Sequence, residues 1–305
     1  MKSRNNITGL LFACPWIIGF IIFTIYPVSA SLYYSFTNFN LFKTATFVGL
    51  SNYKQLIVYD DLFWKSLYNT VYMTIAGTPV FLILSLVMAL LLNMKVRGRA
   101  FYRTLFYLPT VMPMVATSML WLWILNPQIG LMNSALKFLG LPRLNWLVSP
   151  SLTKPSLILI GMWATGNIMI FFLASLQEIS VSLYESAEID GARSIGKFFY
   201  ITLPSITPVI FYQLIVNFIY NFQYFTQAYV ILTGSSGQGN ASYVAGNGGP
   251  ENSMLFYALY LYHRGFVYFK MGEASAMAWI LFVIVALVTL LIFKTSNKWV
   301  NYGGE

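Results

Sequence analysis

Six apolar stretches, each long enough to cross a membrane as a helix, dominate this sequence. They cover approximately residues 8–36, 69–94, 104–126, 155–177, 205–233 and 271–293. About 20 helical residues cross the roughly 30 Å hydrocarbon core of a bilayer. The composition agrees, because only 9% of the 305 residues are charged, against about 25% in soluble domains. We therefore expect an all-α polytopic membrane protein in which residues 1–305 form a single transmembrane domain of six helices.

The first apolar stretch is compatible with either a membrane span or a cleaved signal peptide. Its length, and the lack of a small-residue cleavage site after it, favour a span. Pro15 and Pro27 lie within it, and membrane helices tolerate prolines. The net charge of +9 indicates basic cytoplasmic loops and anionic lipid rather than nucleic acid. The lone cysteine, Cys14, excludes a disulfide framework and a cysteine-based metal site.

The positive charges predict the orientation of the chain in the membrane. Four cations lie close together between the second and third stretches: Lys95, Arg97, Arg99 and Arg103. Short cytoplasmic loops are enriched in Lys and Arg, so this loop is expected in the cytoplasm. With six spans, both termini are then cytoplasmic, and the long connections 37–68, 127–154 and 234–250 are external.

The most polar segment, residues 176–208, lies between the fourth and fifth stretches. It contains four of the nine acidic residues, which are Glu178, Glu185, Glu188 and Asp190. The pattern predicts a helix from Ser182, a break at Gly191, and a second apolar face that ends at Pro204. The pattern alone leaves two interpretations open, a solvated connector and a docking surface for another protein.

The same segment contains a misleading motif. Residues Gly191–Lys197 spell G-x-x-x-x-G-K, the start of a phosphate-binding loop, but Phe198 follows. A phosphate-binding loop needs a hydroxyl at that position to bind magnesium, and a strand before the first glycine. We therefore expect no nucleotide site in this chain.

Residues 184–208, YESAEIDGARSIGKFFYITLPSITP, closely resemble the E-A-A, D-G and I-x-L-P signature of the membrane subunits of bacterial ATP-binding-cassette importers. The sequence is most similar to the branch that serves oligosaccharides and glycerol phosphate. PWIIGFIIFTIYP, SFTNFN, FVGLSNY, RTLFYLP and MGEASAMAW extend the resemblance over roughly residues 10–295. Two departures are Ser186, where the family has alanine, and the long Gly-rich loop 234–250.

The resemblance implies the fold of a type I importer permease in a bacterial cell membrane. Residues 178–204 would form a cytoplasmic coupling segment in which Glu185 faces a basic residue of an ATPase and Gly191 allows a bend. The implied coupling residues are Glu185, Ala187, Asp190, Gly191, Ala192 and Pro204. A second permease, two ATPase subunits and an extracellular binding protein would complete the complex. ATP would be bound by the partners, so this chain would need no cofactor.

A polar stripe in the fifth stretch is the best candidate for a sugar pathway. Amides and tyrosines recur there at spacings of three and four, which places them on one helical face: Gln213, Asn217, Tyr220, Asn221, Tyr224 and Gln227. Polar side chains in a membrane helix face a bundle interior or a wet cavity. Hydrogen bonding between helices is the alternative. The stretch holds no Lys or Arg, which favours a neutral oligosaccharide over glycerol phosphate.

Several other polar and aromatic residues are weaker candidates. Trp163 and Asn167 in the fourth stretch could also contact substrate, whereas Trp121 and Trp123 are interpreted as interfacial anchors. His263, the only histidine, has no partner at ligand spacing and is expected to be exposed rather than to bind a metal. No catalytic constellation occurs in the spans, so the chain itself is not expected to be an enzyme.

A stand-alone secondary carrier or channel is the alternative function. Proton coupling usually needs an ionisable residue near the bilayer middle, yet Glu178 and Glu273 fall at span ends and the spans otherwise contain no acid. Six spans are also few for a carrier that works alone. Both observations favour the importer subunit.

Overall fold

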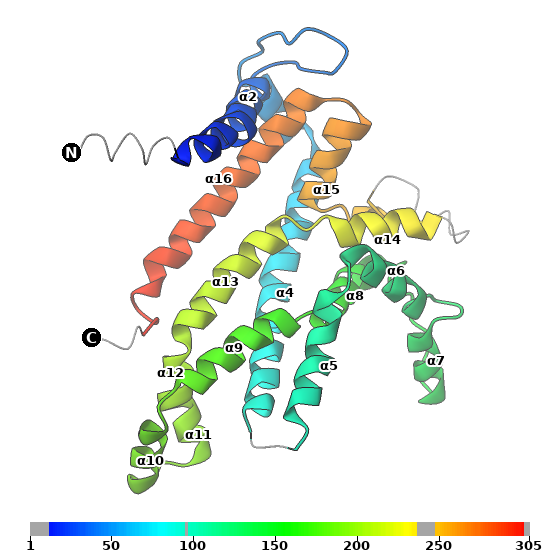
Figure 1. Ribbon diagram of the computed structural model, residues 1–305. Coiled ribbons are helices and arrows are strands. Elements are labelled where there is room, and N and C mark those ends of the chain that lie inside the picture. The colour runs from blue at the N-terminus through cyan, green and yellow to red at the C-terminus, as the bar shows by residue number, and fades with distance from the viewer. Residues whose placement is uncertain (1–11, 95–96, 237–247, 302–305) are drawn as a thin grey trace, which may run out of the picture. The chain divides into compact units, whose positions relative to one another are not determined.

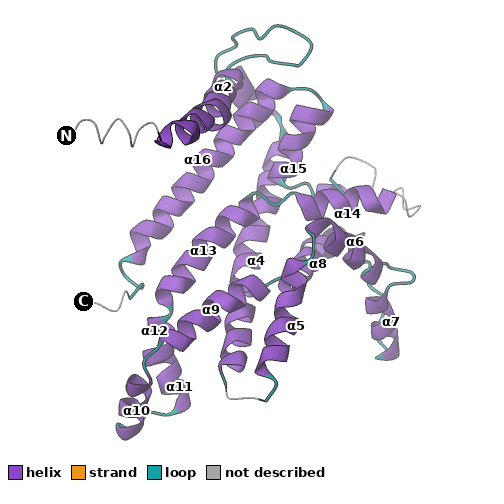
Figure 2. Cartoon of the chain, viewed as in Figure 1, coloured by secondary structure: helices purple, strands orange, loops and turns teal. Residues whose placement is uncertain are grey.

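The computed structural model describes residues 12–94, 97–236 and 248–301 (Figure 1). In these ranges the chain consists of helices joined by loops and turns and has no strand (Figure 2), which confirms the predicted all-α class. The start of the first stretch, Lys95 and most of the loop 234–250 lie outside the described residues.

Three of the six apolar stretches form continuous helices. These are Phe12–Ser35, α4 (Asp61–Asn93) and α16 (Met271–Ser296). The first includes the π-helical turn η1 (Ile21–Ile25) and α2 (Tyr26–Ser35). Each is long and apolar enough to cross a membrane.

The other three stretches form bent pairs of helices. α5 (Arg99–Val111) and α6 (Met114–Ile124) meet at 99°, α8 (Pro150–Trp163) and α9 (Gly166–Glu178) at 51°, and Ser194–Ser205 and Thr207–Gly234 at 62°. Among the described residues, three helices are therefore long and apolar enough to cross a membrane, or up to six if each bent pair is one span. The α5–α6 bend has a local cause, because Pro113 keeps Met112 in an extended conformation that a helix cannot contain.

The chain divides into two compact units. One contains Met1–Phe63 and Leu261–Ile284, and the other contains Trp64–Tyr260 and Val285–Glu305. That they belong to one domain stays a prediction from the sequence.

The first unit contains α2, α3 (Ser51–Tyr59), the π-helical turn η5 (His263–Val267) and the first half of α16. The buried Asn52 donates hydrogen bonds to Ser35 O and Thr37 O, at 2.8 and 2.9 Å. Gly272 packs closely here, since a Cβ would lie 2.1 Å from Thr37 O. These contacts tie α3 and α16 to the turn that follows α2.

A partly buried ionic cluster stabilises the first unit. Arg264 pairs with Asp60 and, at 3.0 Å, with Glu273, which also pairs with Lys270. Asp60 Oδ1 accepts the N–H groups of Leu62 and Phe63, at 3.1 and 3.2 Å. Asp60 thus caps α4 while it neutralises Arg264.

The second unit holds the remaining helices around two apolar clusters. They include α7 (Leu131–Phe138), α10 (Val181–Ile189), α11 (Ser194–Lys197), η2 (Phe198–Thr202), α12 (Leu203–Ser205), α13 (Thr207–Phe222), α14 (Thr226–Ser236), η4 (Pro250–Asn252) and most of α15 (Tyr257–Tyr262). α9 crosses α5 closely, because a Cβ on Gly166 would lie 2.4 Å from Phe106 O. α10 and α11 lie together at one end of this unit (Figure 1).

Candidate functional site

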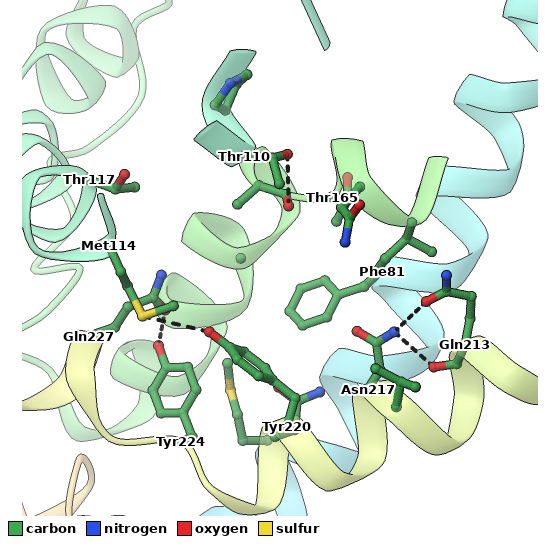
Figure 3. A pocket seen from close by; sticks show the side chains of 18 of the residues that line it. Phe81, Thr110, Met114, Thr117, Thr165, Gln213, Asn217, Tyr220, Tyr224 and Gln227 are labelled. Atoms are coloured by element: carbon green, nitrogen blue, oxygen red, sulfur yellow. Dashed lines mark hydrogen bonds between the residues drawn. The ribbon is translucent and has the colours of Figure 1, made fainter. Parts of the chain in front are cut away.

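A cavity of about 330 Å³ lies within the second unit. Its walls come from α4, α5, α6, α8, α9, α13 and α14, and several polar side chains surround it in Figure 3. The polar lining comprises Thr110, Thr117, Thr165, Asn167, Gln213, Asn217, Tyr220, Asn221, Tyr224 and Gln227. Phe81 and several methionines supply apolar surface. Cavities of about 300–1,000 Å³ with few polar groups on an apolar wall are typical of small-molecule sites.

All six residues of the polar stripe in the fifth stretch line this cavity. The expectation of one uninterrupted helix is wrong, however, because α13 ends at Phe222 and α14 begins at Thr226. Gln223 and Tyr224 instead form tight turns, with hydrogen bonds from their N–H groups to carbonyls three residues earlier. Tyr224 therefore lies in the break and Gln227 on the next helix. The sequence around Gln223 and Tyr224 contains no Gly or Pro that would have predicted this break.

The stripe residues are held by hydrogen bonds within the cavity wall. Asn217 Nδ2 donates to Gln213 O at 2.8 Å and to Gln213 Oε1 at 3.4 Å (Figure 3). The Tyr224 hydroxyl donates to Gln227 Oε1, and the Tyr220 hydroxyl contacts Met114 Sδ at 3.6 Å. Each amide has two donors and a two-lone-pair acceptor. These bonds use part of that capacity, and the remainder can bind a polar ligand.

Asn221 lines the cavity and also makes a hydrogen bond between two helices. Its Nδ2 donates to Thr78 Oγ1 of α4 at 2.9 Å, and both side chains are buried. This bond between α13 and α4 is the interhelical alternative that the sequence left open. Asn221 therefore supports the cavity wall as well as lining it.

The candidates in the fourth stretch have different positions. Asn167, on α9, lines the cavity. Trp163 is not among the lining residues, and its ring packs edge-on against Trp121 at a centroid distance of 5.8 Å. Trp121 belongs to the apolar core, so its interpretation as an interfacial anchor is wrong, whereas Trp123 is 72% exposed.

Sequence reasoning missed Phe81 and the threonines of α5 and α6. Gly161 allows the ring of Phe81 to approach α8, since a Cβ at Gly161 would lie 2.5 Å from Phe81 Cζ. The run Pro109–Pro113, with two prolines around Thr110, is a helix-break signal that could have identified this wall. The contribution of Phe81 has no comparable sequence signal.

The segment 178–204 contains the predicted break. α10 ends at Ile189, and Gly191 adopts a φ of +77°. The N–H of Ala192 donates to Ala187 O at 2.8 Å, and the N–H of Gly191 to Glu188 O at 3.0 Å. This pair of bonds is a Schellman motif, which ends a helix with a left-handed residue. The D-G-A sequence thus sets the direction of the chain after α10.

The second arm of this segment runs further than expected. Helical structure continues through η2 and α12 and passes Pro204, so the expectation that Pro204 ends the segment is wrong. The bend falls two residues later, between Ser205 and Thr207. The two arms are joined by the Tyr184 hydroxyl and Thr202 Oγ1, 2.9 Å apart, and by an ion pair of Lys197 with Glu188.

The surface of this segment is apolar as well as acidic. Ile189 is 88% exposed and Ile195 74% exposed, and Leu183 and Glu185 are exposed on α10. Asp190 is exposed beside Gly191. Exposed apolar side chains beside charged groups are typical of a protein-binding surface.

His263 is buried, with 8% of its surface exposed, so its predicted exposure is wrong. It begins η5, beside the ring of Tyr262, and burial lowers its pKa. Among the described residues, no group of three His, Cys, Asp or Glu side chains could hold a metal ion.

Residues 81–301 match the family described as "Binding-protein-dependent transport system inner membrane component". "Probable ABC transporter permease protein YesP" of Bacillus subtilis (strain 168) is 42% identical, over 98% of this chain and 93% of that protein. "Lactose transport system permease protein LacF" of Rhizobium radiobacter is 34% identical, over 98% of this chain and 97% of that protein.

The fold is similar to that of a solved transporter. The match is to the "crystal structure of a bacterial ABC transporter involved in the import of the acidic polysaccharide alginate", with a TM-score of 0.76 and 23% identity. It covers 98% of this chain and 99% of that one. At this identity the match supports the fold alone.

Proposed function

Because the chain belongs to the family of inner-membrane components of binding-protein-dependent transport systems, we propose that it is the permease subunit of an ATP-driven importer for a neutral oligosaccharide. The main support for this proposal is the cavity, whose lining offers amides, hydroxyls and aromatic rings. Among the described residues, this lining contains no charged side chain. A sugar has polar edges and a C–H face, so this lining suits it. Relatives named for lactose and arabinooligosaccharide transport support the sugar class.

Glycerol phosphate is the second candidate substrate, because a permease named for sn-glycerol-3-phosphate transport is 32% identical to this chain. A phosphate carries up to two negative charges, and its sites normally contain Arg or Lys. The described residues that line the cavity include neither. A neutral substrate therefore fits the cavity better.

The exposed α10–α11 surface supports the coupling role. We infer that α10 docks on an ATPase subunit, with Glu185 facing a basic residue and Gly191 giving the bend.

A second permease and two ATPase subunits complete the complex, and an extracellular binding protein delivers the sugar. ATP is then bound by the partners, and this chain is non-catalytic and needs no cofactor. The basic loop between α4 and α5 favours an orientation in which both termini are cytoplasmic. A stand-alone carrier or channel would not need the docking surface.

Uptake by the complete complex in proteoliposomes tests this function. The assay compares a labelled neutral oligosaccharide, a uronic-acid oligosaccharide and glycerol phosphate, each with its binding protein present. Asn217→Leu should impair uptake of the neutral sugar only partially, since one hydrogen bond contributes about 0.5–1.5 kcal/mol. Asn221→Leu should impair it more, because it also leaves Thr78 without its partner.

The control is Gln223→Leu, which removes an exposed amide from the same segment outside the cavity lining. It should transport like the unaltered protein. If Asn217→Leu also transports normally per inserted complex, the substrate path lies elsewhere. If only glycerol phosphate is taken up, the neutral-sugar proposal is wrong.

A further inference from the structure

The connection after α6 forms a rigid platform outside the cavity. Its centre is the buried side chain of Asn133, on α7. Asn133 Nδ2 donates to Pro127 O at 3.0 Å and to Leu144 O at 2.9 Å, while Oδ1 accepts the Leu144 N–H at 3.1 Å and Trp146 Nε1–H at 3.0 Å. An amide has two donors and two lone pairs. All are used, so α7 and the chain on both sides of it are held together.

This platform exposes several large apolar side chains. Phe138 is 91% exposed, and Ile129, Leu131 and Leu139 are also exposed, as is Trp123 on α6. A groove of about 840 Å³ runs between α6 and α7 and is lined by Leu120, Trp123, Ile124, Asn126, Gln128, Ile129 and Leu131. Exposed contiguous apolar surface marks a contact with a membrane or another protein.

A polar cleft of about 470 Å³ adjoins this groove, and Gln128 lines both. Two exposed cations, Lys137 and Arg143, line the cleft with Ser134, Asn133 and the ring of Phe138. They are the only charged residues between positions 127 and 149. The platform thus places positive charge, hydroxyl and amide beside a long apolar groove.

We propose that the cleft binds the phosphate headgroup of an anionic phospholipid and that the groove holds one of its acyl chains. Charge complementarity favours this ligand, because two cations face the cleft and the segment has no acid. A second copy of this chain is disfavoured, since each copy carries a net charge of +9. Helices with Lys or Arg beside Trp, Phe and Leu are typical of the membrane interface, which agrees with the exposed Trp123.

Quenching of tryptophan fluorescence by brominated lipids tests the proposal in the assembled transporter, reconstituted in nanodiscs. The probes are brominated phosphatidylglycerol and brominated phosphatidylcholine. The signal of Trp123 is obtained by subtracting the signal of the Trp123→Phe variant. We expect phosphatidylglycerol to quench Trp123 more strongly. The Lys137→Gln/Arg143→Gln variant should lose this preference by roughly tenfold or more in lipid concentration.

The matched control is Lys43→Gln/Lys54→Gln, which removes two exposed cations from another predicted external connection. It should keep the preference. Equal quenching by the two lipids, or an unchanged preference without Lys137 and Arg143, would overturn the proposal. Loss of the preference in excess inorganic phosphate would assign the cleft to a soluble phosphate instead. Absence of quenching by either lipid would show that a protein covers the groove, and would equally overturn it.

Discussion

Gly191 offers the sharpest test of coupling, because the bend after α10 depends on the left-handed backbone conformation of this one residue. Its φ of +77° is left-handed, and a Cβ there would meet no atom within 4 Å. Gly191→Ala therefore introduces conformational strain without a steric clash. The left-handed conformation costs roughly 1–2 kcal/mol for a residue with a side chain. That is comparable to the two hydrogen bonds of the Schellman motif, each contributing about 0.5–1.5 kcal/mol.

The expected result is a loss of coupling without a loss of folding. Strain of 1–2 kcal/mol changes a conformational population by about 5–30-fold, so the bent form no longer dominates. ATP hydrolysis stimulated by the sugar-loaded binding protein should fall severalfold in the assembled complex. Gly191→Asn should fall less, since Asn adopts the left-handed conformation more readily. Gly191→Pro should abolish stimulation, because proline fixes φ near −65° and has no N–H for Glu188 O.

Gly196→Ala is the matched control for this experiment. Gly196 lies in α11, also with no atom within 4 Å of a Cβ, but without a positive φ. Alanine is favoured over glycine in a helix, so stimulation should be normal. The reasoning is refuted if Gly191→Ala and Gly191→Pro both retain full stimulation at normal subunit content, or if the Gly196 and Gly191 alanine variants lose it equally.

The remaining predictions concern docking, assembly and the ionic cluster. Glu185→Lys should abolish stimulated ATP hydrolysis while insertion stays normal, because it reverses an exposed docking charge; Glu185→Gln should lose less. The subunit purified alone should neither transport nor hydrolyse ATP, and robust hydrolysis free of other subunits would contradict the partner argument. Arg264→Gln should destabilise the protein by about 3–5 kcal/mol, since it removes the cation that pairs with the buried carboxylate of Asp60. Thermal unfolding, compared with the exposed Lys43→Gln, measures this loss.

Local patterns in the sequence were sufficient for the class of fold and for the break at Gly191. Long apolar stretches predict membrane helices because each helix satisfies its own backbone hydrogen bonds. The break at Gly191 was also predictable, since the Schellman motif involves only residues 187–192. Such features depend on neighbours along the chain, so the sequence alone carries them.

The tertiary structure decided which side chains meet. The stripe of the fifth stretch lines one cavity although its helix breaks after Phe222, and Phe81 completes the wall from a distant segment. Trp121 and His263 are buried, although the sequence predicted an interfacial anchor and an exposed side chain. The chain's own sequence determined helices and local turns, because these need only neighbouring residues. Burial and the composition of the cavity required packing between distant helices, which no local pattern encodes.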